Sequence, residues 1–166
     1  MPIQGVAKAI SQAKSSFADY GSEMLADDFL QKLIDEYRQA IENTNRLMKE
    51  LNLVALCSNC AAREHGSCCS DEVENWYDSW LLFINLLMGA EIDLVREAPG
   101  QCLFVGAHGC KLIARFSFCV NFLCPEIVQS LTETDKQKLL AVSGAELLAG
   151  WNLEQELRKW IRDNSI

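Results

Sequence analysis

The sequence predicts a mainly α-helical domain that has a cysteine-rich centre and a small β-hairpin within that centre. Three observations support this fold class. Apolar residues recur every three or four positions near both ends of the chain, as they do on one face of an amphipathic helix. All eight cysteines lie between Cys57 and Cys124. Two short apolar runs flank the letters GAHG at 106–109, a pattern typical of a hairpin.

The length of the chain, 166 residues, suits a single domain, residues 1–166. Within it, helices over 22–51 and 132–163 are expected to flank a cysteine-rich core over 57–124. Hydrophobic residues make up 49% of the chain and charged residues 23%, which is the composition of a folded protein.

The charge and hydropathy of the chain exclude two classes of partner. A formal net charge of −8 opposes binding to nucleic acid and to an anionic membrane surface. The longest apolar run, 80–90, is too short to cross a membrane and contains Asn85. Because the first residues also lack a secretory signal pattern, we expect a cytoplasmic protein. A protein partner stays open, and the sequence does not identify one.

The first third of the chain predicts two helices. Residues 5–17 predict a short helix, and Gly21 is the expected break after it. Residues 22–51 predict a longer amphipathic helix, which Asn52 helps to end. Its apolar positions are Phe29, Leu30, Leu33, Ile34, Tyr37, Ile41, Leu47, Met48 and Leu51.

A third helix is expected after the first cysteines, with Ser70 or Asp71 as its cap and Gly89 as its end. Its apolar positions are Val73, Trp76, Tyr77, Trp80, Leu81, Ile84, Leu87 and Met88. The hairpin that follows would present Cys102 and Cys110.

The last part of the chain is again helical in pattern. Ser130 with Glu133 resembles a capping box, which would begin a helix near residue 132. Gly150 is expected to break that helix, and Asn152 with Gln155 would cap a final one.

The cysteines predict metal ligation. A cytoplasmic location disfavours disulfides, because the cytosol keeps thiols reduced. Cys57 and Cys60 form a Cys-x2-Cys pair, the spacing at which a tight turn directs two sulfurs to one point. Adjacent side chains in an extended segment point to opposite sides, so Cys68 and Cys69 could serve two sites or two metals of one cluster. The candidate ligands are Cys57, Cys60, Cys68, Cys69, Cys102, Cys110, Cys119 and Cys124.

Thiolate ligands do not distinguish an iron–sulfur cluster from zinc, since both use thiolates at similar spacings. Two details favour iron: Cys124-Pro125 is similar to the Cys-Pro ending of bacterial ferredoxin motifs, and the stretch before it is apolar. Lys111 and Arg115 are candidate cofactor-binding residues, because nearby cations offset the negative charge of thiolates. No Asp or Glu lies between Ala98 and Cys124.

The two histidines, His65 and His108, each precede a glycine near a cysteine. Either could be a ligand or carry a proton, but a solvated loop position is the simpler interpretation because the thiols already suffice for coordination. No residue is identified as catalytic. The sequence has no nucleotide-binding glycine motif and no serine nucleophile motif.

The cysteine pattern over about 57–124 resembles the zinc- or iron-chelating CxxCxxCC-type family, also called YkgJ-like. Two differences are a longer gap between Cys60 and Cys68, and Phe116 where the family has proline after the arginine. The resemblance implies a metal site without fixing the metal. The matching residues are Cys57, Cys60, Cys68, Cys69, Cys102, Gly109, Cys110, Arg115, Cys119 and Cys124.

Three functions are consistent with these features. An iron–sulfur cluster would suit a redox or electron-transfer role, whereas zinc would suit a structural interaction module. Larger relatives of the family resemble flagellin lysine methylases, which implies a metal-assisted protein-modifying enzyme as an alternative. A thiol-disulfide oxidoreductase that uses Cys57 and Cys60 is a further alternative, but the strand–helix context of such an active site is missing.

Overall fold

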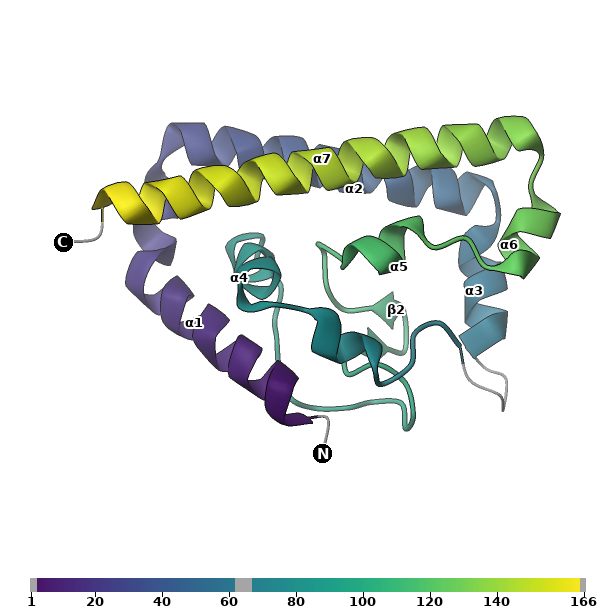
Figure 1. The fold of residues 1–166 in the computed structure, drawn as a ribbon, viewed down its shortest axis with the longest axis horizontal. Helices are drawn as coiled ribbons and strands as arrows, with labels where there is room; N and C mark the ends of the chain where they lie inside the picture. The colour runs from purple at the N-terminus through teal and green to yellow at the C-terminus, as the bar shows by residue number, and fades with distance from the viewer. Residues whose placement is uncertain (1–2, 62–66, 165–166) are drawn as a thin grey trace.

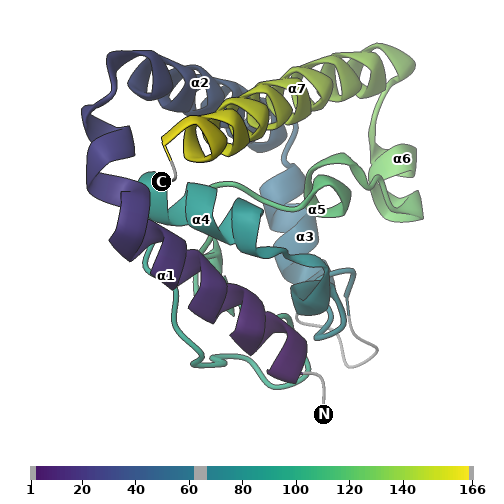
Figure 2. The ribbon, with the colours of Figure 1, turned by 60° about the vertical axis from the view of Figure 1, so that its left-hand side comes forward.

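The computed structural model describes residues 3–61 and 67–164 of the chain. Figures 1 and 2 show a layer of two long helices, α2 and α7, which run side by side over a layer that contains α1, α4 and α5. The predicted mainly helical fold class with a small hairpin is confirmed. In chain order the elements are α1 (Ile3–Ala26), α2 (Asp28–Glu50), α3 (Leu53–Ala61), the 3-10 helix η1 (Val73–Trp76), α4 (Ser79–Leu87), β1 (Val105–Gly106), β2 (Gly109–Cys110), α5 (Ser117–Asn121), α6 (Pro125–Ser130) and α7 (Glu133–Asn164).

The boundary between the first two helices differs from the prediction. Gly21 does not break the chain, because α1 continues through it to Ala26. The break lies at Asp27, whose Oδ1 accepts hydrogen bonds from the backbone N–H groups of Phe29 and Leu30, both at 3.0 Å. The side-chain cap therefore begins α2 at Asp28, and the predicted helix over 22–51 is wrong in its first residues. Its expected end is confirmed, with Asn52 in the left-handed region at φ 60°.

The predicted third helix is divided in two. A short 3-10 helix, η1, is followed by α4, which begins because Asp78 Oδ1 accepts a hydrogen bond from the Leu81 N–H at 2.8 Å. Its end is as predicted, since Met88 closes the helix and Gly89 adopts φ 84°. The caps predicted at Ser70 or Asp71 are wrong for α4.

The last two predicted helices form one continuous helix, α7. Gly150 does not break it, because the ring of Tyr37 on α2 packs directly on that glycine. A Cβ at position 150 would lie 2.7 Å from Tyr37 Cζ. The cap is also two residues later than predicted: Thr132 Oγ1 accepts from the Asp135 N–H at 3.1 Å and donates to Asp135 Oδ2 at 2.7 Å.

The predicted hairpin is present as two antiparallel strands, β1 and β2, with Val105 opposite Cys110 and Gly106 opposite Gly109. Gly109 has φ 102°, a value that only glycine adopts easily, and this allows the tight turn at residues 107–108.

The apolar residues form two clusters. The main core lies between the two layers and takes side chains from α1, α2, α4, the hairpin region and α7. A smaller core lies where the end of α2, α3, α6 and the start of α7 meet, around Leu53, Ile127 and Leu139. Within the residues that the structure describes, none of the helices has the length and hydropathy needed to cross a membrane.

Candidate metal centre

The first and last cysteines of the sequence pack in the same small core. Cys57 and Cys60 lie three residues apart on α3, so they share one side of a helix instead of the tight turn that their spacing suggested. Cys124 precedes α6, where Pro125 occupies the first helical turn. Cys57 and Cys124 both pack against the small core around Leu53 and Ile127.

The second cysteine pair lies beside the hairpin region. The Cys102 N–H donates to the Cys69 carbonyl at 2.7 Å, and Ser70 pairs with Gln101 in an isolated antiparallel bridge. The Ser67 hydroxyl adds a hydrogen bond to Gln101 Oε1 at 2.9 Å. These contacts hold the segment that carries Cys68 and Cys69 against the chain next to Cys102.

Tyr77 links two further segments of the centre. Its hydroxyl donates to Cys119 Sγ on α5 at 3.8 Å and accepts from the Phe116 N–H at 3.1 Å. The Tyr77 ring is buried and packs edge-on against Phe104. Sequence analysis assigned Tyr77 only to an apolar helix face, because a phenol is also a large apolar side chain and periodicity does not reveal its hydroxyl contacts.

The thiol pKa values show that the cysteines influence one another across these segments. Burial raises the pKa of Cys57, and the charges of Cys68, Cys124 and Cys60 raise it further. Burial likewise raises the pKa of Cys102 to about 12, with added effects of Cys110 and Cys119.

The adjacent pair is coupled. A hydrogen bond between the two thiols lowers the pKa of Cys68 and raises that of Cys69, on which burial and the charges of Cys119 and Cys110 act in the same direction. Several thiolates can therefore coexist here only with a compensating positive charge.

The eight cysteines all lie in the described part of the chain, and none of them forms a disulfide. Their thiols are the donor type that iron–sulfur clusters and zinc require. Within residues 3–61 and 67–164, however, no three Cys, His, Asp or Glu side chains are placed so that they could share one ion. His108 is exposed in the hairpin turn, and His65 lies outside the described residues.

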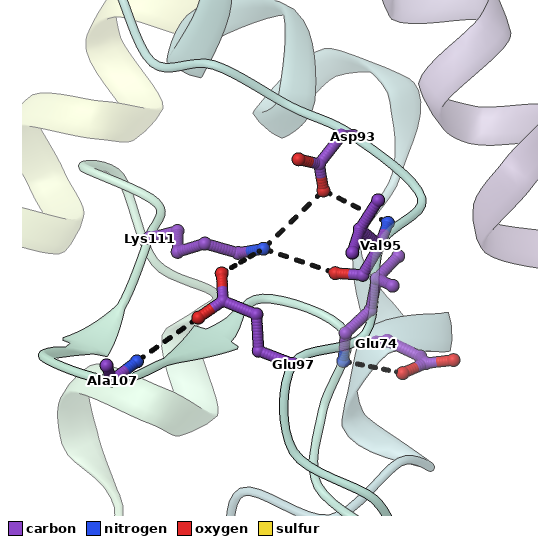
Figure 3. Close-up of polar contacts among 7 residues, drawn as sticks. Glu74, Asp93, Val95, Glu97, Ala107 and Lys111 are labelled. Atoms are coloured by element: carbon purple, nitrogen blue, oxygen red, sulfur yellow. Dashed lines mark hydrogen bonds and ion pairs between the residues drawn. The ribbon is translucent and has the colours of Figure 1, made fainter.

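Lys111 is directed at carboxylates of the preceding loop, as Figure 3 shows. Its Nζ lies 3.1 Å from Glu97 Oε1 and 3.5 Å from Asp93 Oδ1, and it donates to the Val95 carbonyl at 3.3 Å. Glu97 also accepts from the Ala107 N–H at 3.3 Å. Lys111 thus ties the loop to the hairpin, and two acidic partners offset its charge. A direct role toward a cofactor stays a prediction.

Arg115 is a cation that acts on several thiols, and Lys111 acts with it at Cys110. Its Nη2 donates to Asn45 Oδ1 on α2 at 2.8 Å. Burial raises the pKa values of Cys57, Cys110 and Cys119, and the Arg115 guanidinium opposes that rise at each of the three. A role of Arg115 toward a cofactor stays a prediction.

Two buried polar residues hold the segments of the centre in place. Glu74 on η1 is fully buried, and its carboxylate accepts from Arg96 Nη2 and from the Leu103 N–H, both at 2.7 Å. Asn85 on α4 is also fully buried, and its side chain bonds to the backbone of Ile113 and Ala114. The sequence signal for Asn85 is its isolation as a polar residue in an apolar run, because such a residue needs hydrogen-bond partners when it is buried.

Glu146 on α7 is a buried acid between the two long helices. It is fully buried, and neither carboxylate oxygen has a hydrogen-bond partner among the described residues. Burial raises its pKa, an effect that Thr44 and the positive charge of Arg115 only partly oppose. Burial, and then the charge of Glu146, also raise the pKa of Tyr37 on α2.

Replacing Glu146 by Leu should stabilise the protein at neutral pH by about 1–3 kcal/mol, because it removes an unpartnered polar group from the interior. A raised pKa in the folded state means that the wild type loses stability as pH rises from the ordinary glutamate value of 4.5 through the raised value. The gain should therefore shrink below pH 4.5. Urea unfolding across this pH range, with Glu42→Leu at an exposed position of α2 as control, is the measurement. A gain that is constant with pH would contradict the assignment.

The centre thus combines thiols from α3, from the segment after residue 66, from the hairpin region, from α5 and from the start of α6. Its supporting contacts come from Tyr77, Glu74, Asn85 and Arg115. Comparisons of the chain with protein-family models, curated proteins and solved structures gave no match.

Proposed function

We propose that this protein binds metal through cysteine thiolates, as an iron–sulfur cluster or as zinc. The observation that carries the proposal is the gathering of eight thiols from separate chain segments, none in a disulfide, whose charges act on one another. The resemblance of their order to the CxxCxxCC-type family adds support from sequence. Bound metal would supply the positive charge that several thiolates need together, and a redox role would follow only from iron.

The contacts favour two groups of thiols. The charges of Cys60, Cys68 and Cys124 act on Cys57. Of these four cysteines, Cys57 and Cys124 pack against the small core. The other four are Cys69, Cys102, Cys110 and Cys119, which are linked by the Cys69–Cys102 backbone bond and by their mutual charges. Four thiolates are the usual complement of one zinc ion or one cluster. We therefore propose one metal site for each group, with Cys68 and Cys69 at their junction. Because no three of these side chains in residues 3–61 and 67–164 are placed to share one ion, the thiols of each group would have to move closer together when metal binds.

The surroundings favour iron. The Tyr77 hydroxyl donates to Cys119 Sγ, and hydrogen bonds to sulfur are one of the means by which proteins set cluster potentials. Aromatic rings cluster in the same region, with Trp76 edge-on to Phe118 at 5.0 Å between ring centroids. An apolar shell around a metal site limits the access of solvent, which also affects the potential of a cluster.

Anaerobic purification followed by metal and sulfide analysis tests the proposal. Iron with an equal amount of acid-labile sulfide and a brown colour would support the cluster, and colourless protein with about two zinc ions per chain would support the structural site. The Cys57→Ser/Cys60→Ser variant should lose about half of the metal, and Ser58→Ala, between them on α3, should lose none. Protein that takes up neither metal, even after anaerobic reconstitution, would contradict the proposal.

A further inference from the structure

The outer face of α7 is apolar and uncovered. Between Lys138 and Glu154 the only charged residue of this helix is Glu146, and it points inward, fully buried. On the opposite side Leu140, Leu148 and Trp151 are 46%, 59% and 60% exposed. Exposed apolar groups that adjoin one another in this way mark an interaction surface.

The inner side of the same helix is already occupied. α7 packs along α2 and also contacts α5 and α4, and Figures 1 and 2 show it at the edge of the molecule. Gly144 lies on the outer side between Leu140 and Leu148, and a Cβ there would meet no atom within 4 Å. A second helix could therefore approach closely at this point.

The charges at the two ends of this face identify the kind of helix that fits. Along α7 the order is acidic, basic, apolar, acidic, basic. If a second copy of α7 lies antiparallel to the first, each acidic group faces a basic one. If the second copy is parallel, like charges lie next to each other. This order covers residues 133–159 without the inward-facing Glu146, and Arg162 and Asp163 follow beyond it. Its charged residues are Glu133, Asp135, Lys136, Lys138, Glu154, Glu156, Arg158 and Lys159.

The outward positions have the same symmetry. Residues 133, 137, 140, 144, 148, 151, 155 and 159 follow one another at three- and four-residue steps along one side of the helix. An antiparallel pair centred near residue 146 brings Glu133 opposite Lys159. It also brings Leu148 opposite Gly144, so that a large side chain meets a position without one.

Both edges of this face match as well. Lys138 and Glu156 lie on one edge, and Lys136 and Glu154 lie on the other. In the antiparallel pair each lysine meets the glutamate of the second copy. Within a single chain Lys138 Nζ lies 3.9 Å from Asp135 Oδ1. Such exposed ion pairs contribute little to stability, so breaking this pair to form one with the second copy costs little free energy.

We propose that two copies of this protein associate through the outer face of α7, as an antiparallel helix pair about a twofold axis near residue 146. A twofold interface uses the same surface on both subunits, which is why a self-complementary charge order is its expected signature. The metal centre lies on the other side of α7, so association does not depend on the proposed metal function.

Sedimentation equilibrium of the full chain over a wide concentration range tests this. Wild type should have twice the chain mass, and Leu148→Glu should weaken association on the order of a hundredfold, because it places two like charges at the centre. Leu94→Glu, at a loop residue 52% exposed away from α7, should remain dimeric. Circular dichroism should be the same for all three proteins.

The antiparallel direction has its own test. Lys138→Glu should weaken association, and Lys138→Glu with Glu156→Lys should restore it, because each reversed charge then meets its reversed partner. A wild-type protein that is monomeric at every concentration, or a dimer that survives Leu148→Glu, would overturn the proposal. A dimer in which the double variant stays as weak as the single one would overturn the antiparallel arrangement.

Discussion

Replacing Asn85 by Leu is expected to lower the free energy of unfolding by about 3–5 kcal/mol. The Asn85 Oδ1 accepts from the N–H groups of Ile113 and Ala114 at 2.8 and 3.0 Å, and its Nδ2 donates to the carbonyls of Leu81 and Ala114 at 2.9 and 2.8 Å. Leucine has a similar size but leaves these backbone groups buried without partners, and each unsatisfied group costs about 1–3 kcal/mol. Urea unfolding followed by circular dichroism measures the change.

Asn164→Leu is the matched control for this variant. Asn164 is exposed near the end of α7, and among the described residues its side chain bonds to the Trp160 carbonyl at 2.9 Å. Its replacement should therefore change stability by less than about 0.5 kcal/mol. If Asn85→Leu were as mild as the control, the bonds to Ile113 and Ala114 would not hold the segment that leads to Arg115.

The second large effect is expected for Cys57→Ser/Cys60→Ser. In metal-loaded protein this variant should melt more than about 10 °C below wild type, because a structural metal supplies folding free energy that is lost with its ligands. The helical signal should persist in large part at lower temperature. The main core packs α1, α2, α4 and α7 together and includes neither of the two cysteines. Scanning circular dichroism measures both quantities.

Ser58→Ala separates loss of a ligand from disturbance of α3. The Ser58 hydroxyl is exposed and, within residues 3–61 and 67–164, bonds to the Val54 carbonyl of its own helix at 2.9 Å. Its removal should leave melting unchanged, and a strong chelator added to wild type should reproduce the effect of the cysteine variant if the metal is zinc. Equal melting of wild type and the double variant would rule out a structural metal at Cys57 and Cys60.

The helices could be predicted from the sequence because their signal is local. The spacing of Ile34, Tyr37 and Ile41 is visible in the sequence and forms the buried face of α2. Two of the errors arose at glycines, Gly21 and Gly150. Gly150 is held in α7 by the ring of Tyr37, a residue more than a hundred positions away, and this packing outweighs the weak helix propensity of glycine.

The site was predictable only in part. The clustering of cysteines in the sequence indicated where the donors lie. Their support comes instead from pairs such as Glu74 with Leu103 and Tyr77 with Cys119, which are 29 and 42 positions apart. No periodicity connects such pairs, and only the folded chain brings them into contact. Whether these cysteines ligate metal stays a prediction.

The place of α7 in the chain affects how the protein is made. Leu139 and Val142 on this helix complete the small core that holds Cys57 and Cys124. A ribosome synthesises the chain from its N-terminus, so all eight cysteines leave the ribosome before α7 does. Until α7 folds, the small core around Cys57 and Cys124 is incomplete. During that interval the thiols are more open to oxidants and to metal donors than in the finished fold. If the thiols bind a cofactor as proposed, its delivery and oxidative damage to the nascent chain would compete over the same short period of synthesis.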